Sequence, residues 1–316
     1  TIHVVDAGFK ADHSQLDGKT TEFCVGENCN VSGVVRQANA INGDHGLNVS
    51  GHIAADVGDG LTRGVAPNVK LKVSDMSGKI SGSSFEYKIQ ANKWAKGAVA
   101  QNNSWSVGMS HHVVKEFLDG TRSDGQFKNK PYEALAYLYG TTNAKAKELI
   151  NSYSDFQKHG VIVQSISNRN NKYKGDWMNT YKGAHLWNAF PELFPELLQK
   201  AGTGDNKYGA WINVVNLDLV GKKGSGSETY RLESEKCGTV AKYCLGGDAH
   251  GVKSIRYQDD NKTDLAGGTS FMAPTVAGAV ALVAQAFPTQ TPEQWTARLL
   301  ASANNNIKKA SSVSVS

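Results

Sequence analysis

Long charged or apolar runs are missing from this sequence. No five Lys or Arg residues occur in a row, and the net charge of +5 is spread along all 316 residues. Proteins that bind nucleic acid usually concentrate positive charge on one face, so we expect no nucleic-acid partner. No apolar stretch reaches the roughly 18 residues that cross a bilayer, so no membrane span is expected in these residues.

Cysteine is scarce, with four residues that fall into two close pairs, Cys24 with Cys29 and Cys237 with Cys244. Neither pair has the C-x-x-C spacing of zinc ribbons or of thioredoxin-like redox sites. Two short disulfide loops fit the even pairing and imply an oxidising compartment, so a secreted or cell-surface protein is expected. The alternative is four reduced thiols in a cytosolic protein.

A signal peptide is not visible, because no basic segment precedes an apolar stretch at the start of the sequence. Thr1–Val5 instead has the pattern of a strand already inside a domain. If the protein is exported, we expect these residues to be its mature or trimmed form. Residues 311–316 contain only Ser and Val and have the composition of a linker or frayed tail.

The length and the 40% hydrophobic content suit one large soluble domain with a sizeable core. No repeat with a period of roughly 20–50 residues is apparent. We expect a single domain over residues 1–310, with surface insertions near residues 106–160 and 169–208, and a monomeric protein.

Short apolar segments that predict strands alternate with longer segments of helical periodicity. Strands are expected at Ile2–Val5, Val69–Val73, Val161–Ile166 and Trp211–Val215. Helices are expected at Phe85–Ala98, Pro131–Leu149 and after the start signal Thr291–Glu293. This alternation predicts an α/β fold with a mainly parallel central sheet and helices on both faces.

Two residues lie at the carboxyl ends of predicted strands, where ligands bind in parallel sheets. Asp6 closes the first strand, and Ala7 and Gly8 follow it, so no large side chain crowds the carboxylate. Asn168 follows the strand Val161–Ile166 and can donate its side-chain amide into a cleft. Both are also ordinary turn residues, and neither alone identifies a site.

His45 precedes a segment rich in small residues, among them Gly46, Ser50 and Gly51. A helix with one face nearly free of bulk can pack closely on the sheet and hold the imidazole rigidly. Histidine suits proton transfer because its pKa lies near neutrality. The alternative is that one of nine histidines lies in a Gly/Ala-rich stretch by accident.

Ser270 follows a glycine pair and begins an apolar helix that is expected to run to about Phe287. A helix N-terminus presents free N–H groups and partial positive charge, which suit a developing oxyanion. Pro274 lies in the early helix, where a missing N–H costs least. A Ser that merely caps a core helix is the alternative.

The segment Gly268–Pro274 resembles the serine signature of the subtilisin-like proteases (subtilases), with Ser270 at the position of the nucleophile. Asp6–Gly8 resembles the family's aspartate motif, and His45–Gly51, followed by Gly64–Pro67, resembles its histidine motif. The three motifs occur in the family's chain order. The resemblance covers most of the chain.

This resemblance implies a subtilisin-like three-layer α/β fold and a serine endopeptidase that hydrolyses proteins or peptides through an acyl-enzyme. Asp6, His45 and Ser270 would form the catalytic triad, and Asn168 would supply an oxyanion donor. Substrate contacts are implied for Ser104, Trp105, Ser106 and Ser167. No metal or cofactor is implied in the chemistry. Calcium often stabilises the family, but the sequence assigns it no ligands.

The sequence departs from the family pattern at Leu47-Asn48, where Thr-His is usual, and at Ser167, where Gly is usual. Neither change removes a catalytic group, but both affect the substrate side of the site. The segment Cys237–Leu245 resembles a subgroup exported by bacteria as autotransporter passengers. That resemblance implies a Cys237–Cys244 bridge and a surface or released enzyme.

Three other functions remain to be weighed. A degenerate subtilase that binds proteins without cleaving them disagrees with the four intact catalytic positions. An α/β-hydrolase esterase has a G-x-S-x-G elbow and places its nucleophile first in the chain, and Ser270 fits neither. A structural surface protein leaves the serine motif unexplained.

Overall fold

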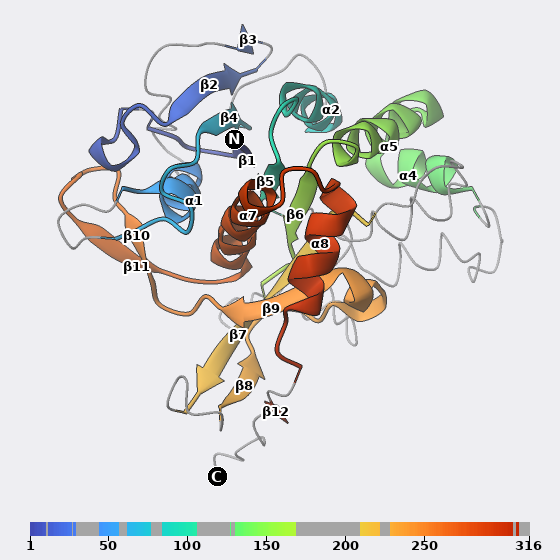
Figure 1. Ribbon diagram of the computed structural model, residues 1–316. Helices are drawn as coiled ribbons and strands as arrows, with labels where there is room; N and C mark the ends of the chain where they lie inside the picture. The colour runs from blue at the N-terminus through green and yellow to red at the C-terminus, as the bar shows by residue number, and fades with distance from the viewer. Residues whose placement is uncertain are drawn as a thin grey trace, which may run out of the picture.

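Strand β1 lies in the middle of a single large sheet, with the order β12-β8-β7-β6-β5-β1-β4-β2-β3 and with β9 paired to β7 (Figure 1). The computed structural model describes residues 1–10, 12–26, 28–29, 44–56, 62–76, 84–105, 127, 130–168, 209–221, 228–305 and 308–309. The sheet is parallel except at β2–β3 and β7–β8. The predicted mainly parallel α/β fold is therefore confirmed.

The bounds of the elements are as follows. The strands of the large sheet are β1 Ile2–Asp6, β2 Thr20–Val25, β3 Asn28–Cys29, β4 Leu71–Asp75, β5 Ala100–Asn103, β6 Val161–Ser165, β7 Trp211–Val220, β8 Thr229–Leu232, β9 Cys244–Asp248 and β12 Lys308–Lys309. A separate hairpin is formed by β10 Val252–Ile255 and β11 Thr263–Ala266. The helices are η1 Ser14–Leu16, α1 His45–Ala54, α2 Ser84–Trp94, α4 Pro131–Tyr139, α5 Asn143–Gln157, η3 Gly238–Tyr243, α7 Thr269–Ala286 and α8 Pro292–Ala301.

Helices cover both faces of the sheet because successive side chains of each strand point to opposite faces. Val161 and Val163 of β6 belong to a core cluster that also contains the inner residues of α1 and α7. Ile162, between them, belongs to a second cluster with the inner residues of α2, α4 and α5. The result is a three-layer arrangement with α1, α7 and α8 on one side (Figure 1).

Helix α7 is the one helix in the described part of the chain that is long and apolar enough to cross a membrane. It packs against α1, β5, β6 and β7, and more than half of it is buried. Its apolar character is therefore that of a central core helix.

Residues 131–149 do not form the single helix that the sequence predicts. Gly140 ends α4 with a φ of 61°, in the left-handed region that glycine tolerates. The side chain of Thr142 then accepts from the backbone N–H of Lys145 and begins α5. A stop signal at Gly140 and a start signal at Thr142, two residues apart, therefore divide the segment.

The interpretation of residues 106–160 as a surface insertion is wrong for α5, which is a core element. Its buried side chains include Ala146, Leu149, Ile150, Tyr153 and Phe156. They pack in the same cluster as Ile162 and Trp211 of the sheet. The charged residues on the outer face of α5 gave the segment its surface-like composition. The expected insertion at 169–208 lies outside the described residues.

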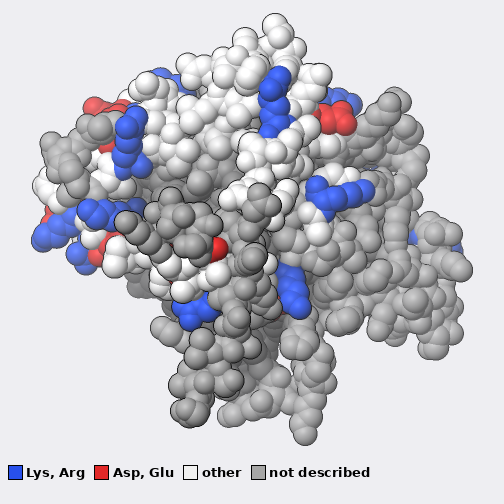
Figure 2. Space-filling model, turned by 60° about the horizontal axis from the view of Figure 1, so that its bottom comes forward, with Lys and Arg blue, Asp and Glu red and all other residues white. Residues whose placement is uncertain are grey.

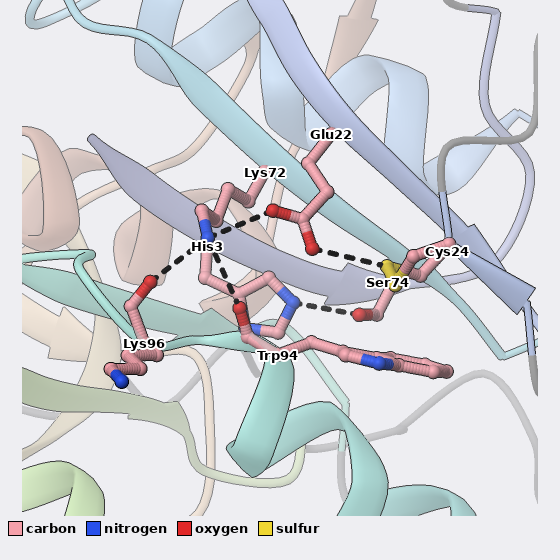
Figure 3. Close-up of a disulfide and its surroundings, with 8 residues drawn as sticks. His3, Glu22, Cys24, Lys72, Ser74, Trp94 and Lys96 are labelled. Atoms are coloured by element: carbon pink, nitrogen blue, oxygen red, sulfur yellow. Dashed lines mark hydrogen bonds and ion pairs between the residues drawn. A yellow bond between two sulfur atoms is a disulfide. The ribbon is translucent and has the colours of Figure 1, made fainter.

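The edge of the sheet beyond β4 is held by polar contacts as well as by a disulfide. Cys24 and Cys29 are bridged and pair directly across β2 and β3. Lys72 of β4 forms an ion pair with Glu22 at 2.9 Å and donates to the carbonyl of Lys96 at 2.9 Å (Figure 3). These contacts join β2, β4 and the end of α2.

His3 lies under this edge and is fully buried in β1. Its Nε2 is 2.7 Å from Ser74 Oγ (Figure 3). Burial lowers the pKa of His3 to about 3, an effect that a hydrogen bond to Gln101 opposes and that the charge of Lys72 reinforces. His3 is therefore neutral in the folded protein near neutral pH.

We predict that His3→Gln makes the protein less sensitive to acid. In the wild type, His3 of the unfolded state is protonated below about pH 6.5, whereas His3 of the folded state is protonated only below about pH 3. The free energy of unfolding should therefore fall by about 1.4 kcal/mol per pH unit through this range. Unfolding by urea between pH 7 and pH 4 measures this slope. His250→Gln is the control, because His250 is exposed; equal slopes in the two variants would contradict the assignment.

Candidate active site

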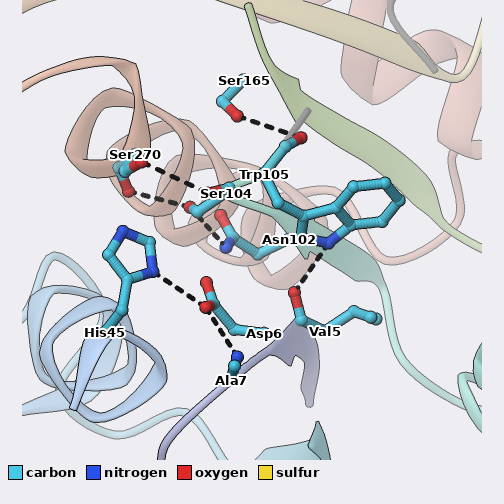
Figure 4. Close-up of polar contacts among 9 residues, drawn as sticks. All are labelled: Val5, Asp6, Ala7, His45, Asn102, Ser104, Trp105, Ser165 and Ser270. Atoms are coloured by element: carbon cyan, nitrogen blue, oxygen red, sulfur yellow. Dashed lines mark hydrogen bonds and ion pairs between the residues drawn. The ribbon is translucent and has the colours of Figure 1, made fainter. Parts of the chain in front are cut away.

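Asp6 and His45 are held together by the backbone that joins β1 to α1. At the start of α1, the N–H of Gly46 donates to the carbonyl of Ala7 and the N–H of Leu47 donates to the carbonyl of Gly8, both at 2.8 Å. His45 is thereby placed over the end of β1, and its Nδ1 lies 2.8 Å from Asp6 Oδ1 (Figure 4). The fold thus places these two residues in direct contact.

Asp6 is almost buried, with a side-chain exposure of 4%, whereas His45 is 23% exposed. Asp6 Oδ1 also accepts from the backbone N–H of Ala7 at 2.7 Å. A carboxylate can only accept, so His45 Nδ1 carries the proton and the other ring nitrogen is free to act as a base. That nitrogen faces Ser270 (Figure 4).

The protonation of His45 is set by two opposing effects. Burial lowers the pKa of His45, but the charge of Asp6, its hydrogen bond and the charge of Asp44 together outweigh this effect. The pKa of His45 is therefore raised above the ordinary value of 6.5. The imidazole is a stronger base here than it is in water.

Ser270 is the second residue of α7, and Gly268 comes immediately before the helix with a φ of 101°. In this structure Ser270 Oγ donates to the carbonyl of Ser104 at 3.2 Å (Figure 4). The hydroxyl lies on the same side as the free nitrogen of His45 (Figure 4). Ser270 is therefore at the positive end of a helix.

Asn168 lies beside Gly268 and is oriented by Thr269. Its Oδ1 accepts from the backbone N–H of Thr269 at 2.9 Å, while the Thr269 hydroxyl donates to the carbonyl of Ile166. Because a backbone N–H can only donate, the atom that faces it is the amide oxygen. The NH₂ group therefore points the other way, which is the orientation that an oxyanion donor requires.

The four predicted substrate-binding residues differ in how close they lie to Ser270 and in how exposed they are. Ser104 contacts Ser270 directly. Trp105 is turned inward, since its indole N–H donates to the carbonyl of Val5 at 2.9 Å and its carbonyl accepts from Gln164 (Figure 4). Ser167 is 8% exposed. Ser106 lies outside the described residues.

Both predicted disulfides form, Cys24–Cys29 and Cys237–Cys244. Cys24 and Cys29, with Glu22, are also the one cluster of potential metal ligands among the described residues. The two sulfurs are bonded to each other, which leaves a single carboxylate, and calcium requires about six to eight oxygen ligands. This cluster therefore does not fit calcium.

Residues near the site that sequence reasoning missed are His52, Phe271 and Thr275. His52 Nε2 lies 2.9 Å from Thr275 Oγ1, and this contact joins α1 to α7. The ring of Phe271 meets the rings of both His45 and His52 edge-on. His52 lies seven residues after His45, which is two helical turns, so helical spacing is a signal that points to it.

On the face shown in Figure 2, described Lys and Arg residues are scattered, and several lie next to Asp or Glu.

A carboxylate, an imidazole and a hydroxyl at one end of a parallel sheet define a serine hydrolase. The chain matches the model of the Subtilase family over residues 1–314 and belongs to that family. It is therefore a serine protease.

Solved structures with the same fold include the nisin leader peptidase NisP from Lactococcus lactis, at 17% identity and a TM-score of 0.61, covering 98% of this chain and 84% of that one. Fervidolysin from Fervidobacterium pennivorans, a keratinolytic enzyme, matches at 20% identity and a TM-score of 0.58 over 92% of this chain. This chain spans only 37% of fervidolysin. No curated protein matches the chain.

We predict that Gly268→Ala damages the site more than the fold. The added Cβ would lie 2.8 Å from Asn168 Oδ1, and the backbone conformation of Gly268 is one that residues with a side chain rarely adopt. Such strain costs about 1–3 kcal/mol of stability. Displacing the Asn168 amide should lower kcat by about 10²-fold, as loss of an oxyanion donor does.

The control for Gly268→Ala is Gly97→Ala. Gly97 also has a positive φ, of 84°, but a Cβ there meets nothing within 4 Å. Its kcat should match that of the wild type. Peptide hydrolysis and thermal unfolding are measured for both variants, and an equal loss of kcat in both would show that Asn168 is not displaced.

Proposed function

We propose that this subtilase is a serine endopeptidase that cleaves proteins or peptides through an acyl-enzyme, with Asp6, His45 and Ser270 as its triad. The observation that carries the proposal is the 2.8 Å contact between Asp6 and His45, which leaves the other imidazole nitrogen facing Ser270. This arrangement supports Asp6 as the carboxylate, His45 as the base and Ser270 as the nucleophile.

In the first half of the reaction, His45 takes the proton of Ser270 Oγ as this oxygen bonds to the substrate carbonyl carbon. For this transfer, the Ser270 hydroxyl must give up its hydrogen bond to the Ser104 carbonyl and donate to His45 instead. Catalytic hydrogen bonds of this kind often tighten only when substrate binds. The negative charge moves to the carbonyl oxygen, where the Asn168 amide and the Ser270 N–H stabilise it. Collapse expels the amine, which takes its proton from His45.

In the second half, water replaces the amine. His45 takes a proton from the water as its oxygen bonds to the acyl carbon, and the serine oxygen leaves with the proton that His45 returns. Asp6 stabilises the charged imidazole in both halves. Subtilases need no cofactor for this chemistry.

Substrate is proposed to lie extended beside Ser104–Ser106 and to add a strand through backbone hydrogen bonds. The position of Ser104 next to Ser270 supports this orientation. We also propose that Trp105 and Ser167 contribute to substrate binding.

The enzyme is proposed to act outside the cytosol, secreted or on the cell surface, as a monomer. Two disulfides support an oxidising compartment. Membership of the autotransporter-passenger subgroup and stabilisation by calcium at residues not yet assigned stay proposals of the same kind.

We predict that a fluorophosphonate labels the folded protein once, on Ser270. The probe reacts with serines that a neighbouring base activates, so Ser270→Ala and His45→Ala should both lose the label, and Ser270→Ala should lose peptide hydrolysis. Peptide mapping identifies the labelled residue. Ser302→Ala, on the exposed end of α8, is the control. Folded wild type without label would favour a binding protein over an enzyme.

We predict that kcat/KM falls as the pH is lowered through a value above 6.5. His45 must be neutral to accept the serine proton, and Asp6 raises the pKa of His45. Asp6→Asn removes the charge that raises this pKa. The variant should lose about 10⁴-fold in kcat, and its residual activity should fall only at a lower pH than that of the wild type. Ester hydrolysis from pH 4 to pH 9 measures both effects, and an unmoved acid limb would contradict the pairing.

A further inference from the structure

The strand below Ser270 carries buried polar side chains where parallel sheets ordinarily have apolar ones. Gln101, Asn102 and Asn103 of β5 are 1%, 0% and 0% exposed. Buried polar groups cost free energy unless they are hydrogen-bonded. Their partners therefore show what the strand contributes.

The polar residues of β5 divide between the two faces of the sheet. Gln101 faces α2, where its amide donates to Asn92 at 2.9 Å, and Asn103 shares that face. Asn102 is in register with Val4 of β1, which belongs to the core cluster of α7. Because the side-chain period of a strand is two, Asn102 and Ser104 share the α7 face.

Ser104 and Ser270 bind each other through two hydrogen bonds. Ser104 Oγ donates to the carbonyl of Ser270 at 2.8 Å, and Ser270 Oγ donates to the carbonyl of Ser104 at 3.2 Å (Figure 4). Asn102 Nδ2 donates to Ser104 Oγ at 3.0 Å. The Ser104 hydroxyl has one proton, which the Ser270 carbonyl takes, so it can only accept from Asn102.

The Ser270 carbonyl needs this partner because the helix does not provide one. In an α-helix a carbonyl accepts from the N–H four residues later, which for Ser270 is residue 274. That residue is Pro274, which has no N–H. The Ser104 hydroxyl takes the place of the missing donor and fixes the plane of the Ser270 peptide, from which the nucleophilic side chain projects.

We propose that Asn102 is a positioning residue for Ser270. Its amide holds the Ser104 hydroxyl in the orientation that binds the Ser270 carbonyl, and the Ser270 side chain is aimed through this relay. Asn102 Oδ1 meets no partner among the described residues, so the amide NH₂ is the group that acts. The inference rests on the proposed role of Ser270 as nucleophile.

The test compares Asn102→Leu with Asn103→Leu in the folded protein. Leu is close to Asn in size and cannot donate, and both residues are fully buried in the same strand. Misplacement of a reacting group by a fraction of an ångström costs rate rather than affinity. Asn102→Leu should lower kcat by about tenfold and change KM by less than about threefold, whereas Asn103→Leu should keep kcat within about twofold.

Two further measurements separate positioning from a structural role. The urea midpoint of Asn102→Leu should not fall below that of Asn103→Leu. The double variant Asn102→Leu/Ser104→Ala should have the kcat of Ser104→Ala alone, because Asn102 acts only through the Ser104 hydroxyl. The rate of fluorophosphonate labelling at Ser270 should fall in parallel with kcat.

Each contrary outcome identifies what failed. Equal kcat in the two Leu variants, or additive losses of kcat in the double variant, would overturn the relay. If the wild type still hydrolyses peptides and takes the label, the proposed function stands in that case. Wild-type protein that neither hydrolyses peptides nor takes the label at Ser270 would overturn the proposed function, and the role of Asn102 with it.

Discussion

The N–H groups at the start of α1 bind the carbonyls of the turn that follows β1, and this short backbone contact holds His45 over Asp6. Gly46 makes the approach possible, since a Cβ at that position would lie 2.5 Å from the ring of Phe9. β1 itself is fixed between β4 and β5. The geometry of the acid and the base is thus set by main-chain hydrogen bonds and by the absence of a side chain at Gly46.

The nucleophile depends on a different kind of support. Ser270 is the second residue of α7, and Pro274, four residues later, has no N–H to donate, so the Ser270 carbonyl relies on the side chain of Ser104, just after β5. The neighbouring residue Thr269 orients Asn168 on the other side. One turn of α7 therefore receives restraints from two adjacent strands, β5 and β6, whose carboxyl ends meet at this edge of the sheet.

The two groups of the proposed triad that exchange a proton are carried by helices that pack together. α1 carries His45 and α7 carries Ser270, and His52 and Thr275 join the two helices by a hydrogen bond one layer below the site. Burial lowers the pKa of His52 to about 4, so this contact is made by a neutral imidazole over the range in which His45 titrates. His45 therefore changes its charge at a higher pH than His52, so the contact between the helices is unaffected while His45 titrates.

The sequence by itself determined the α/β class, the strands around Asp6 and Asn168, the helix that follows Ser270 and both cysteine pairs, because periodicity, caps and close spacing are local properties. Only the tertiary structure decided that α5 is a core element, that Trp105 turns inward and that Asn102, Ser104 and Ser270 form one relay. These facts depend on which strands become neighbours. Residues 102 and 270 are far apart in the chain, and only the register of the sheet and the packing of α7 upon it place them together.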